Sequence, residues 1–475
     1  MDLPNYFLAD LPPEAMLSPS MITAACETLK RNREKYLAPR KMEELIQILC
    51  EVAAGWLEPN NKFRRLALDS LRSAGLRHGS MLATSNEPCR EAGAPLPGFS
   101  AATVARGLDD FFRQFTPENF QALLAQDLGE TVAPADSAGG IRHPSRVTRH
   151  FWHGPQLLVH VAAGQIPNPA LLSLTLGLLT RSAQFMKCAS GASFLPRLYA
   201  HSIYEADHKL GACLELAEWR GGNVALEAAL LAEADCLTAT GSDESLAAIR
   251  PRVPPNVRFL GYGQRVSFGF VTREALRDEL MAELVARVAD DVVAWDQTGC
   301  LSPHVIYAEE RGAVESDNFA QLLAVELMSR EAAAPRGTIS VEEAAAIASP
   351  RTIYETLALH RGDVKIWQSQ NSTAWTVVFE HETRFHLSPL NRFIFVKPVP
   401  GLAAVFPGVD ELKGKVSTVG VAAPPERLKE LAPQLARWGV TRICPVGQMQ
   451  NPPLTWRHDG RPALGDLVTW TDVEI

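Results

Sequence analysis

The sequence contains no cysteine pair at a metal-binding or redox spacing. Its 475 residues include eight cysteines, at positions 26, 50, 89, 188, 213, 236, 300 and 444, and no CxxC motif occurs. Neither a zinc knuckle nor a dithiol redox centre is therefore indicated, and we expect no metal site. Scattered, unpaired cysteines are typical of a reducing compartment, so the sequence predicts a cytoplasmic protein.

Long apolar segments are also missing. The longest apolar run, Ala170 to Leu179, is interrupted by Ser173 and Thr175 and is too short to span a bilayer. The N-terminus has neither the basic region nor the apolar region of a secretion signal. We therefore expect no membrane span.

Positive charge is not in excess. There are 46 Lys and Arg against 54 Asp and Glu, a net charge of −8, which argues against binding to nucleic acid or to an anionic membrane surface. Hydrophobic residues make up 46% and charged residues 21%, an ordinary soluble composition. A chain of this length is too long for one core, so two or three domains are expected.

The N-terminal part of the chain is predicted to be mostly helical. Apolar residues recur at helical spacing from Met42 to Trp56. Ser18 and Pro19 form a favourable N-cap and first-turn pair. The segments 84–99 and 133–145 are rich in Pro, Gly and polar residues and are expected to be loops.

Strand-like and helical segments alternate after about residue 154, which favours a doubly wound parallel sheet. The expected strands are 156–162, 184–189, 236–240 and 257–260, and the expected helices are 169–180, 196–219 and 242–249. Ligands of such sheets bind beyond the carboxyl ends of the strands.

A second α/β unit is expected after residue 265. Its expected helices are 274–295, 316–330, 340–360 and 425–439, and its strand-rich stretches are 304–308, 364–380, 392–399 and 441–445. The remaining tail is expected to be loop-like, with a hairpin turn at Asp459 and Gly460.

The sequence has no GxGxxG motif, so the ordinary dinucleotide fingerprint is absent. One strand-to-helix crossing, Thr240-Gly241-Ser242, offers a different phosphate or ribose site. Gly241 allows close backbone approach, and Ser242 can cap a helix whose N-terminus points into the crevice. An N-capped helix without a ligand explains the same residues equally well.

Cys300 lies between a helical run and an apolar strand. Gly299 and the Ser302-Pro303 pair place it in irregular backbone, where scaffolded catalytic groups tend to occur. A thiol is a competent nucleophile where its surroundings favour the thiolate. Local sequence alone favours a small core residue, as most free cysteines are.

The motifs around Cys300 change that interpretation. From about residue 154 onward the chain contains, in order, GQIPNPALLSL, KCASGASFLPRLYA, ATGSDESLAAI, RFLGYGQRVSFG, WDQTGCLSPHVIY, STAWTVVFE, SPLNRFIFVKP and RICPVGQMQNPPLTWRHDGRP. In this order they resemble the acyl-CoA reductase family, the LuxC-type fatty acyl thioester reductases of the aldehyde dehydrogenase superfamily.

The resemblance implies an aldehyde dehydrogenase-like α/β fold. An N-terminal helical region would span residues 1–135, and a doubly wound sheet that binds the nicotinamide cofactor would span 136–264. An α/β catalytic domain with the nucleophilic cysteine would span 265–445, and residues 446–475 would form a C-terminal tail.

The implied reaction converts a fatty acyl thioester and reduced nicotinamide into an aldehyde and a free thiol. Cys300 falls on the superfamily nucleophile. Its backbone NH and a side-chain amide would stabilise the tetrahedral oxyanions. The amide position matches Gln165, where many superfamily members have Asn, and Asn168 is an alternative.

The cofactor implied is NADPH. Lys187 matches the superfamily lysine at the adenine ribose, and Thr240, Gly241 and Ser242 belong to the same cofactor site. NAD-preferring relatives often carry a Glu three residues after this lysine, whereas Ser190 stands there and would not repel a 2′-phosphate.

Hydrolytic aldehyde dehydrogenases use a glutamate to activate water, and the matching position here is Phe259. A missing general base removes a contribution of roughly 100- to 10,000-fold, which favours thioester reduction. Two alternatives stay open: an aldehyde-oxidising dehydrogenase with Glu309 or Glu310 as its base, and a non-catalytic acyl-carrying scaffold. The partners implied are acyl-CoA or an acyl-carrier thioester, further copies of the chain in a homo-oligomer, and acyl-transferring proteins.

Overall fold

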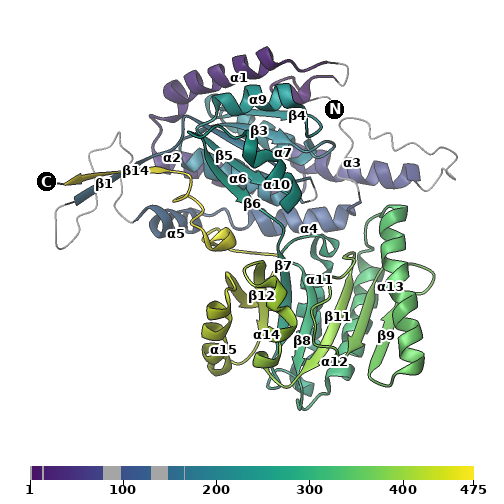
Figure 1. The fold of residues 1–475 in the computed structure, drawn as a ribbon. Coiled ribbons are helices and arrows are strands. Elements are labelled where there is room, and N and C mark those ends of the chain that lie inside the picture. Colours follow the sequence, from purple (N-terminus) through teal and green to yellow (C-terminus); the bar gives the residue numbers. More distant parts are fainter. Residues whose placement is uncertain (1–2, 13–14, 79–97, 130–147, 165, 475) are drawn as a thin grey trace.

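The computed structural model describes residues 3–12, 15–78, 98–129, 148–164 and 166–474. It contains a five-stranded sheet and a seven-stranded sheet, which Figure 1 shows one above the other. The predicted α/β class is confirmed. Gln165 and the expected loops 84–97 and 133–145 lie outside the described residues.

The N-terminal helices cover the five-stranded sheet. They are α1 (Pro19–Asn32), α2 (Met42–Leu57), α3 (Lys62–His78), α4 (Ala101–Phe112) and α5 (Pro117–Leu128). The predicted cap is confirmed, because Met21 N donates to Ser18 Oγ at 3.3 Å. The apolar stripe of α2 buries Leu45, Leu49 and Trp56 in a core shared with helices of the sheet layer.

The five-stranded sheet is parallel, with the order β4-β3-β2-β5-β6. Its strands are β2 (Leu157–Val161), β3 (Ala183–Cys188), β4 (Leu214–Glu218), β5 (Cys236–Thr240) and β6 (Arg258–Tyr262). The chain builds outward from β2 to β4 and then returns to β5 on the other side of β2. The topological switch point, where such sheets bind ligands, therefore lies between β2 and β5.

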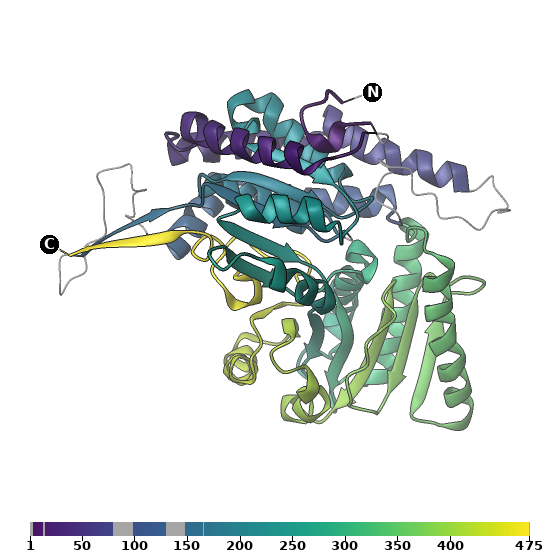
Figure 2. The same cartoon turned by 45° about the horizontal axis from the view of Figure 1, so that its top comes forward.

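Helices lie on both faces of this sheet. They are α6 (Asn168–Leu179), α7 (Phe194–Ala206), α8 (His208–Gly211), α9 (Val224–Glu233) and α10 (Asp243–Ile249). In Figures 1 and 2, α1 lies beside α9 over one face, and the two helices share a core with β2 and β3. The range 196–219 is mostly helix, as expected, but its end, residues 214–218, is the strand β4. A five-residue segment is too short for its periodicity to distinguish a strand from a helix end.

The seven-stranded sheet has the order β13-β12-β7-β8-β11-β10-β9, and only β9 is antiparallel to its neighbour. Its strands are β7 (Val266–Val271), β8 (Pro303–Glu309), β9 (Val364–Gln368), β10 (Thr376–Glu380), β11 (Phe393–Val399), β12 (Val416–Ala422) and β13 (Arg442–Pro445). The accompanying helices are α11 (Asp278–Val293), α12 (Ser316–Ala333), α13 (Val341–His360), α14 (Phe406–Val409) and α15 (Pro425–Trp438). Strands β7 and β12 were not expected from the sequence.

The C-terminal tail has the expected loop-like backbone up to Val468, apart from one 3-10 turn, and then ends in a strand. Strand β14 (Thr469–Glu474) pairs antiparallel with β1 (Thr148–His153), and the pair projects from the body in Figures 1 and 2. The expected hairpin turn is a 3-10 turn at His458–Gly460, with Asp459 in the left-handed region at φ 54°. Before β14 the tail crosses β6, where Arg258 donates to Val468 O at 2.6 Å.

The helices of the described residues include none with both the length and the apolar character needed to cross a membrane. The most apolar of the sheet-layer helices, α6, has 12 residues, about 18 Å of helix against a hydrocarbon layer of about 30 Å.

Candidate active site

Cys300 follows a strained turn at the end of α11. Trp295, Asp296 and Gln297 are three consecutive non-glycine residues with left-handed backbone, at φ 50°, 48° and 65°. Each such residue costs roughly 1–3 kcal/mol and persists only where its surroundings determine it. The turn that carries Cys300 must therefore be held in place by contacts elsewhere.

The holding contacts come from a second left-handed turn, Leu390 to Arg392, at the start of β11. Arg392 contacts the Asp296 carboxylate at 2.7 and 2.9 Å, and both side chains are buried. Gln297 and the Phe393 backbone exchange two hydrogen bonds, each of 2.7 Å. These contacts fix the Cys300 turn to the centre of the seven-stranded sheet.

The residues next to Cys300 leave little room for change. Ser267 Oγ on β7 donates to Cys300 O at 2.8 Å. A Cβ atom on Gly299 would lie 3.0 Å from both Ile166 and Gln450, so only glycine fits without displacing them. Gln450 also donates to Ser302 Oγ. The tail of the chain thus supports the cysteine turn from the other side.

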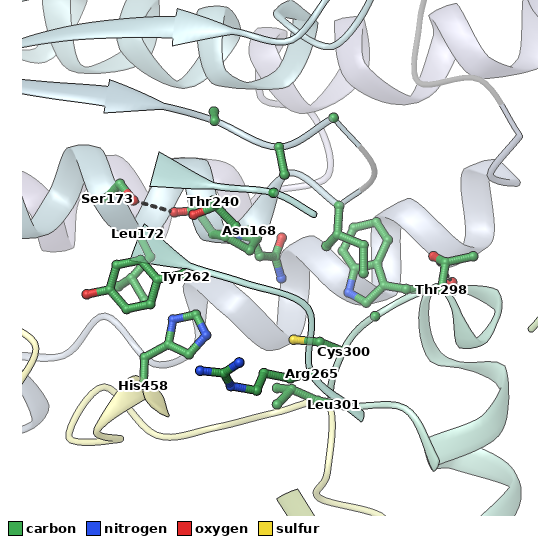
Figure 3. A pocket seen from close by; sticks show the side chains of 18 of the residues that line it. Asn168, Leu172, Ser173, Thr240, Tyr262, Arg265, Thr298, Cys300, Leu301 and His458 are labelled. Atoms are coloured by element: carbon green, nitrogen blue, oxygen red, sulfur yellow. Dashed lines mark hydrogen bonds between the residues drawn. The ribbon is translucent and has the colours of Figure 1, made fainter. Parts of the chain in front are cut away.

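The Cys300 side chain is exposed to a large cavity between the two sheets. The cavity has a volume of about 1,100 Å³ and extends along the carboxyl ends of β2, β3 and β5. Helices α4 and α6, the Cys300 turn and tail residues between 450 and 467 complete its wall. Figure 3 shows the Cys300 sulfur at this cavity, beside Arg265 and below Asn168. The crevice expected at the switch point is therefore present, and it contains the predicted nucleophile.

The surroundings of Cys300 favour the thiol over the thiolate. Although the sulfur is reached from the cavity, the enclosing protein desolvates it and raises its pKa to about 11, and the nearby Asp459 charge acts in the same direction. At pH 7 roughly one Cys300 in ten thousand would be ionised. The resting site needs an additional group to remove the thiol proton.

This pKa predicts the reactivity of the free protein. Alkylation of Cys300 by iodoacetamide should rise about tenfold per pH unit between pH 7 and 9, because the thiolate fraction grows in that proportion below the pKa. Peptide mass spectrometry after timed alkylation measures the rate. Buried Cys188 and Cys236, whose pKa values are raised to about 12, should stay unlabelled in the folded protein and serve as internal controls. A rate that levels off below pH 8 would contradict this prediction.

The cofactor candidates lie along one wall of the cavity. Lys187 is the second-last residue of β3, Thr240 is the last residue of β5, and Gly241 and Ser242 follow β5. Ser242 is the N-cap of α10, as predicted, and accepts from Ser245 N at 3.2 Å. Lys187 is buried, and its ammonium group has no hydrogen-bond or ion-pair partner in the described part of the chain. A buried cation without a partner at the cavity wall fits the hydroxyl or phosphate oxygens of a nicotinamide cofactor.

Ser190 does not line the cavity with Lys187. It is exposed on the turn after β3, next to a carboxylate that anchors this turn. Glu218 accepts from Gly191 N at 2.6 Å and from Ser193 Oγ at 2.5 Å. Burial lowers the pKa of Lys187, and Glu227 opposes this effect.

Of the two amides considered for the oxyanion site, Gln165 lies outside the described residues. Asn168 is the first residue of α6 and lines the cavity. Its Nδ2 donates to Gly107 O at 3.3 Å, and its buried Oδ1 has no hydrogen-bond partner among the described residues. In Figure 3 this amide points toward the space above Cys300.

The expectation that Phe259 stands at the reacting thioester is wrong. Phe259 pairs with Leu237 in the sheet and packs in the apolar layer beneath α1 and α9. Side chains alternate between the two faces of a strand, so Phe259 and Tyr262 point to opposite sides. The residue of β6 that lines the cavity is Tyr262, followed by Gly263, Gln264 and Arg265. This segment still presents no carboxylate to the site.

Glu309, considered as an alternative base, is remote from Cys300. It lies at the far end of β8, six residues beyond Pro303, or about 20 Å along the strand. Its carboxylate is paired with Arg427 at 2.9 Å and Arg273 at 3.2 Å. It is therefore not a base for water at the thioester.

Comparison with known families agrees with this geometry. The family described as acyl-CoA reductase (LuxC) matches residues 90–470, which is most of the chain. The chain belongs to the acyl-CoA reductase family. The resemblance predicted from the motifs is thus confirmed, and the matched region includes Cys300 and the whole tail up to β14.

Curated relatives of this family member include a long-chain acyl-protein thioester reductase of Aliivibrio fischeri, 26% identical over 324 residues. A second protein of this kind, from Photobacterium leiognathi, is 24% identical over 321 residues. Both alignments cover 66% of this chain, and the chain spans about 63% of the length of each relative.

Solved structures similar to this member of the family include dehydrogenases with an aldehyde dehydrogenase-like fold. Glyceraldehyde-3-phosphate dehydrogenase from Methanocaldococcus jannaschii, complexed with NADP, has a TM-score of 0.64 at 10% identity, covering 97% of this chain and 95% of that one. The Δ-pyrroline-5-carboxylate dehydrogenase of Mycobacterium tuberculosis has a TM-score of 0.63 at 12% identity, covering 96% and 83%. At these identities the similarity shows the fold, and the predicted aldehyde dehydrogenase-like fold is confirmed.

Several residues of the candidate site were not predicted from the sequence. Arg265 and His458 line the cavity close to Cys300, and Tyr262 lies between their segments. The motif WRHDGRP contributes to the family resemblance and predicts a turn, but the sequence analysis gives its side chains no role at the site. Its four ionisable residues are the signal that could indicate such a role.

Proposed function

We propose that this chain reduces a fatty acyl thioester, acyl-CoA or an acyl carrier, to an aldehyde with NADPH, through an acyl-Cys300 intermediate. The observation that supports this proposal most directly is that a single cavity is lined by Cys300, by the cofactor candidates such as Lys187, and by a set of apolar side chains. In this proposal the five-stranded sheet binds the cofactor and the seven-stranded sheet carries the nucleophile.

The cavity supplies what the acyl part of such a substrate needs. Apolar side chains from α6, from the segment just before it and from the tail line the cavity, including Ile166, Leu172, Leu176, Leu454 and Leu467. Burial of a fatty chain against them contributes about 0.8 kcal/mol for each CH₂ group. The acyl carbonyl would lie at the Cys300 sulfur, with the Cys300 NH and the Asn168 or Gln165 amide as candidate donors to its oxyanion.

When bound, NADPH supplies the hydride that converts the acyl-cysteine into aldehyde. The residues of the chain bind and orient it: Lys187 would contact the adenine ribose, and the Thr240-Gly241-Ser242 segment would lie along it. After reduction, loss of the aldehyde returns the Cys300 sulfur to its free state. The lack of a carboxylate from Tyr262 to Arg265 supports this path over hydrolysis of the acyl-cysteine.

The test uses purified protein, a panel of acyl-CoAs, and NADPH or NADH. With nicotinamide we expect aldehyde and free CoA in equal amounts. Without nicotinamide we expect one acyl group per chain, seen as an intact acyl-protein by mass spectrometry. Release of free acid beyond one equivalent, with no aldehyde, would indicate hydrolysis and would contradict the proposal.

We further propose that NADPH is used better than NADH, supported by the unpaired Lys187. Ser190 follows Ala189, which lines the cavity, so a carboxylate at position 190 would lie near its edge. Ser190→Glu should therefore lower the ratio of kcat/KM for NADPH to that for NADH by about tenfold, because the carboxylate repels a 2′-phosphate. Steady-state kinetics with both cofactors measures the ratio. Ser329→Glu, on the exposed face of α12, is the matched control and should leave the ratio unchanged. An unchanged ratio in Ser190→Glu would show that the ribose lies elsewhere.

The curated relatives carry the name acyl-protein thioester reductase, which supports a protein-bound acyl donor as the physiological substrate. We therefore propose acyl-transferring proteins as partners and expect a homo-oligomer. Comparison of kcat/KM for acyl-CoA with that for an acylated carrier protein tests the donor. A scaffold role would predict donor binding without any aldehyde formation.

A further inference from the structure

The tail places one histidine of the WRHDGRP motif in the cavity. The ring of His458 stacks on Tyr262 with 4.6 Å between centroids and an interplanar angle of 19°. Trp456 packs against the same histidine at 4.6 Å. Neither ring nitrogen of His458 has a hydrogen-bond partner within the described residues. The aromatic contacts therefore hold the imidazole and leave its nitrogens available.

Two charged residues accompany this imidazole. The Asp459 side chain is only 5% exposed, neither of its oxygens has a hydrogen bond in the described residues, and it pairs with Arg265 at 3.0 Å. His458 Nε2 lies 4.0 Å from Asp459 Oδ1. In Figure 3 the side chains of Arg265 and His458 extend toward one another, and the Cys300 sulfur faces the same space. Three segments far apart in sequence thus converge at the nucleophile.

We propose that His458 is the acid–base group of Cys300, with Arg265 stabilising the thiolate and Asp459 positioning both. This inference rests on the proposed function. His458 takes the thiol proton, directly or through one water, while the sulfur forms its bond to the thioester carbonyl carbon. The bond between that carbon and the donor sulfur then breaks, and His458 returns the proton to the departing thiolate. The products are acyl-Cys300, a free donor thiol and neutral His458, and no electrons are transferred.

The charges around His458 suit this role. Burial lowers its pKa, Arg461 and Arg265 act in the same direction, and Asp459 opposes them. A further cation lies close by, since the Arg461 guanidinium is 4.3 Å from the centroid of the Tyr262 ring on which His458 stacks. His458 is therefore neutral at pH 7 and ready to accept a proton, which the raised pKa of Cys300 makes necessary.

A second histidine near Cys300 is less suited. His304 on β8 lines the cavity, but its Nδ1 accepts a hydrogen bond from Ser388 N at 3.1 Å. In its neutral form the other nitrogen, Nε2, then carries the proton and cannot accept another. Burial also lowers its pKa to about 4.

The test compares two hexadecanoyl thioesters that differ in leaving group, one of N-acetylcysteamine and one of thiophenol. The aryl thiolate leaves without protonation, whereas the alkyl thiolate is helped by an acid. In His458→Gln, single-turnover acylation of Cys300 should fall about 1,000-fold with the alkyl thioester, which loses both the base and the acid, and about 30-fold with the aryl thioester, which loses only the base. Acylation by wild type should depend less steeply on pH above 7 than acylation by the variant, which should rise about tenfold per pH unit.

Controls separate this role from a structural one. His381→Gln, in an exposed turn after β10, should match wild type with both thioesters. His458→Ala, checked for unchanged thermal unfolding, should regain alkyl-thioester acylation when imidazole is added. The inference would be overturned if His458→Gln lost the same factor in acylation rate with both thioesters, or lost none. It would also be overturned if the leaving-group effect appeared in His304→Gln instead. If the wild-type protein is not acylated by either thioester, the proposed function itself is wrong. A failure of the His458 inference alone would leave wild-type acylation intact.

Discussion

Replacement of Cys300 by alanine should remove both acyl-protein formation and aldehyde production, by at least roughly 10,000-fold in kcat/KM. None of the other described cysteines lines the cavity. Cys26, Cys188, Cys213 and Cys236 are buried, and burial raises the pKa of each to about 12. The cavity, in contrast, brings substrate directly to the Cys300 sulfur.

Intact-mass analysis after mixing with acyl-CoA measures the acylation, and absorbance of the reduced nicotinamide measures turnover. Cys444→Ala is the matched control, because Cys444 lies on β13 of the same sheet and away from the cavity wall. It should retain acylation and turnover. Turnover at the wild-type level in Cys300→Ala would exclude the covalent mechanism. If both wild type and variant bind the acyl donor but neither turns it over, the scaffold role would be favoured.

Asp296→Ala should lower the free energy of unfolding by about 3 kcal/mol and reduce acylation of Cys300. The substitution leaves the Arg392 guanidinium, only 2% exposed, without the carboxylate that it contacts at 2.7 Å. Removal of one partner from a buried ion pair leaves an uncompensated charge, which is strongly destabilising. Glu331, at 2.7 Å from Arg392, compensates part of that charge. The left-handed residues before Cys300 would also lose the contact that holds them.

Urea unfolding measures the stability, and single-turnover acylation measures the effect on the nucleophile. Asp363→Ala is the control, since it breaks an exposed pair with Arg361 and should cost less than about 1 kcal/mol. We expect the acylation defect to persist at low temperature, where the variant is fully folded. A destabilised variant with wild-type acylation would show that the ion pair contributes stability without positioning Cys300.

The local sequence was sufficient for the elements that local rules control. Ser18 and Ser242 cap helices as predicted because the caps depend on residues three positions away. Alternation of strands and helices predicted the parallel sheet and hence the crevice in which Cys300 is found. The irregular segment around Cys300 was also recognised, although its strain was not.

Other features depended on contacts between distant residues. The exposed strand β14 forms because it pairs with β1, more than 300 residues earlier in the chain, as at Thr148 opposite Glu474. Phe259 does not reach the cavity, although its motif matches the position of a catalytic base, because the register of β6 against β5 decides which side chains face the cavity.

The sequence by itself determined the family and the fold class, and it predicted Cys300 as the nucleophile. Only the tertiary structure decided which ionisable groups surround that nucleophile. Arg265 and His458 are 193 positions apart and meet because the tail folds back across β6, where Arg461 donates to Gly261 O at 2.8 Å. Helical and strand periodicities extend over only a few residues, so no local pattern predicts that these two residues lie together. The packing of the two sheets around one cavity brings them together.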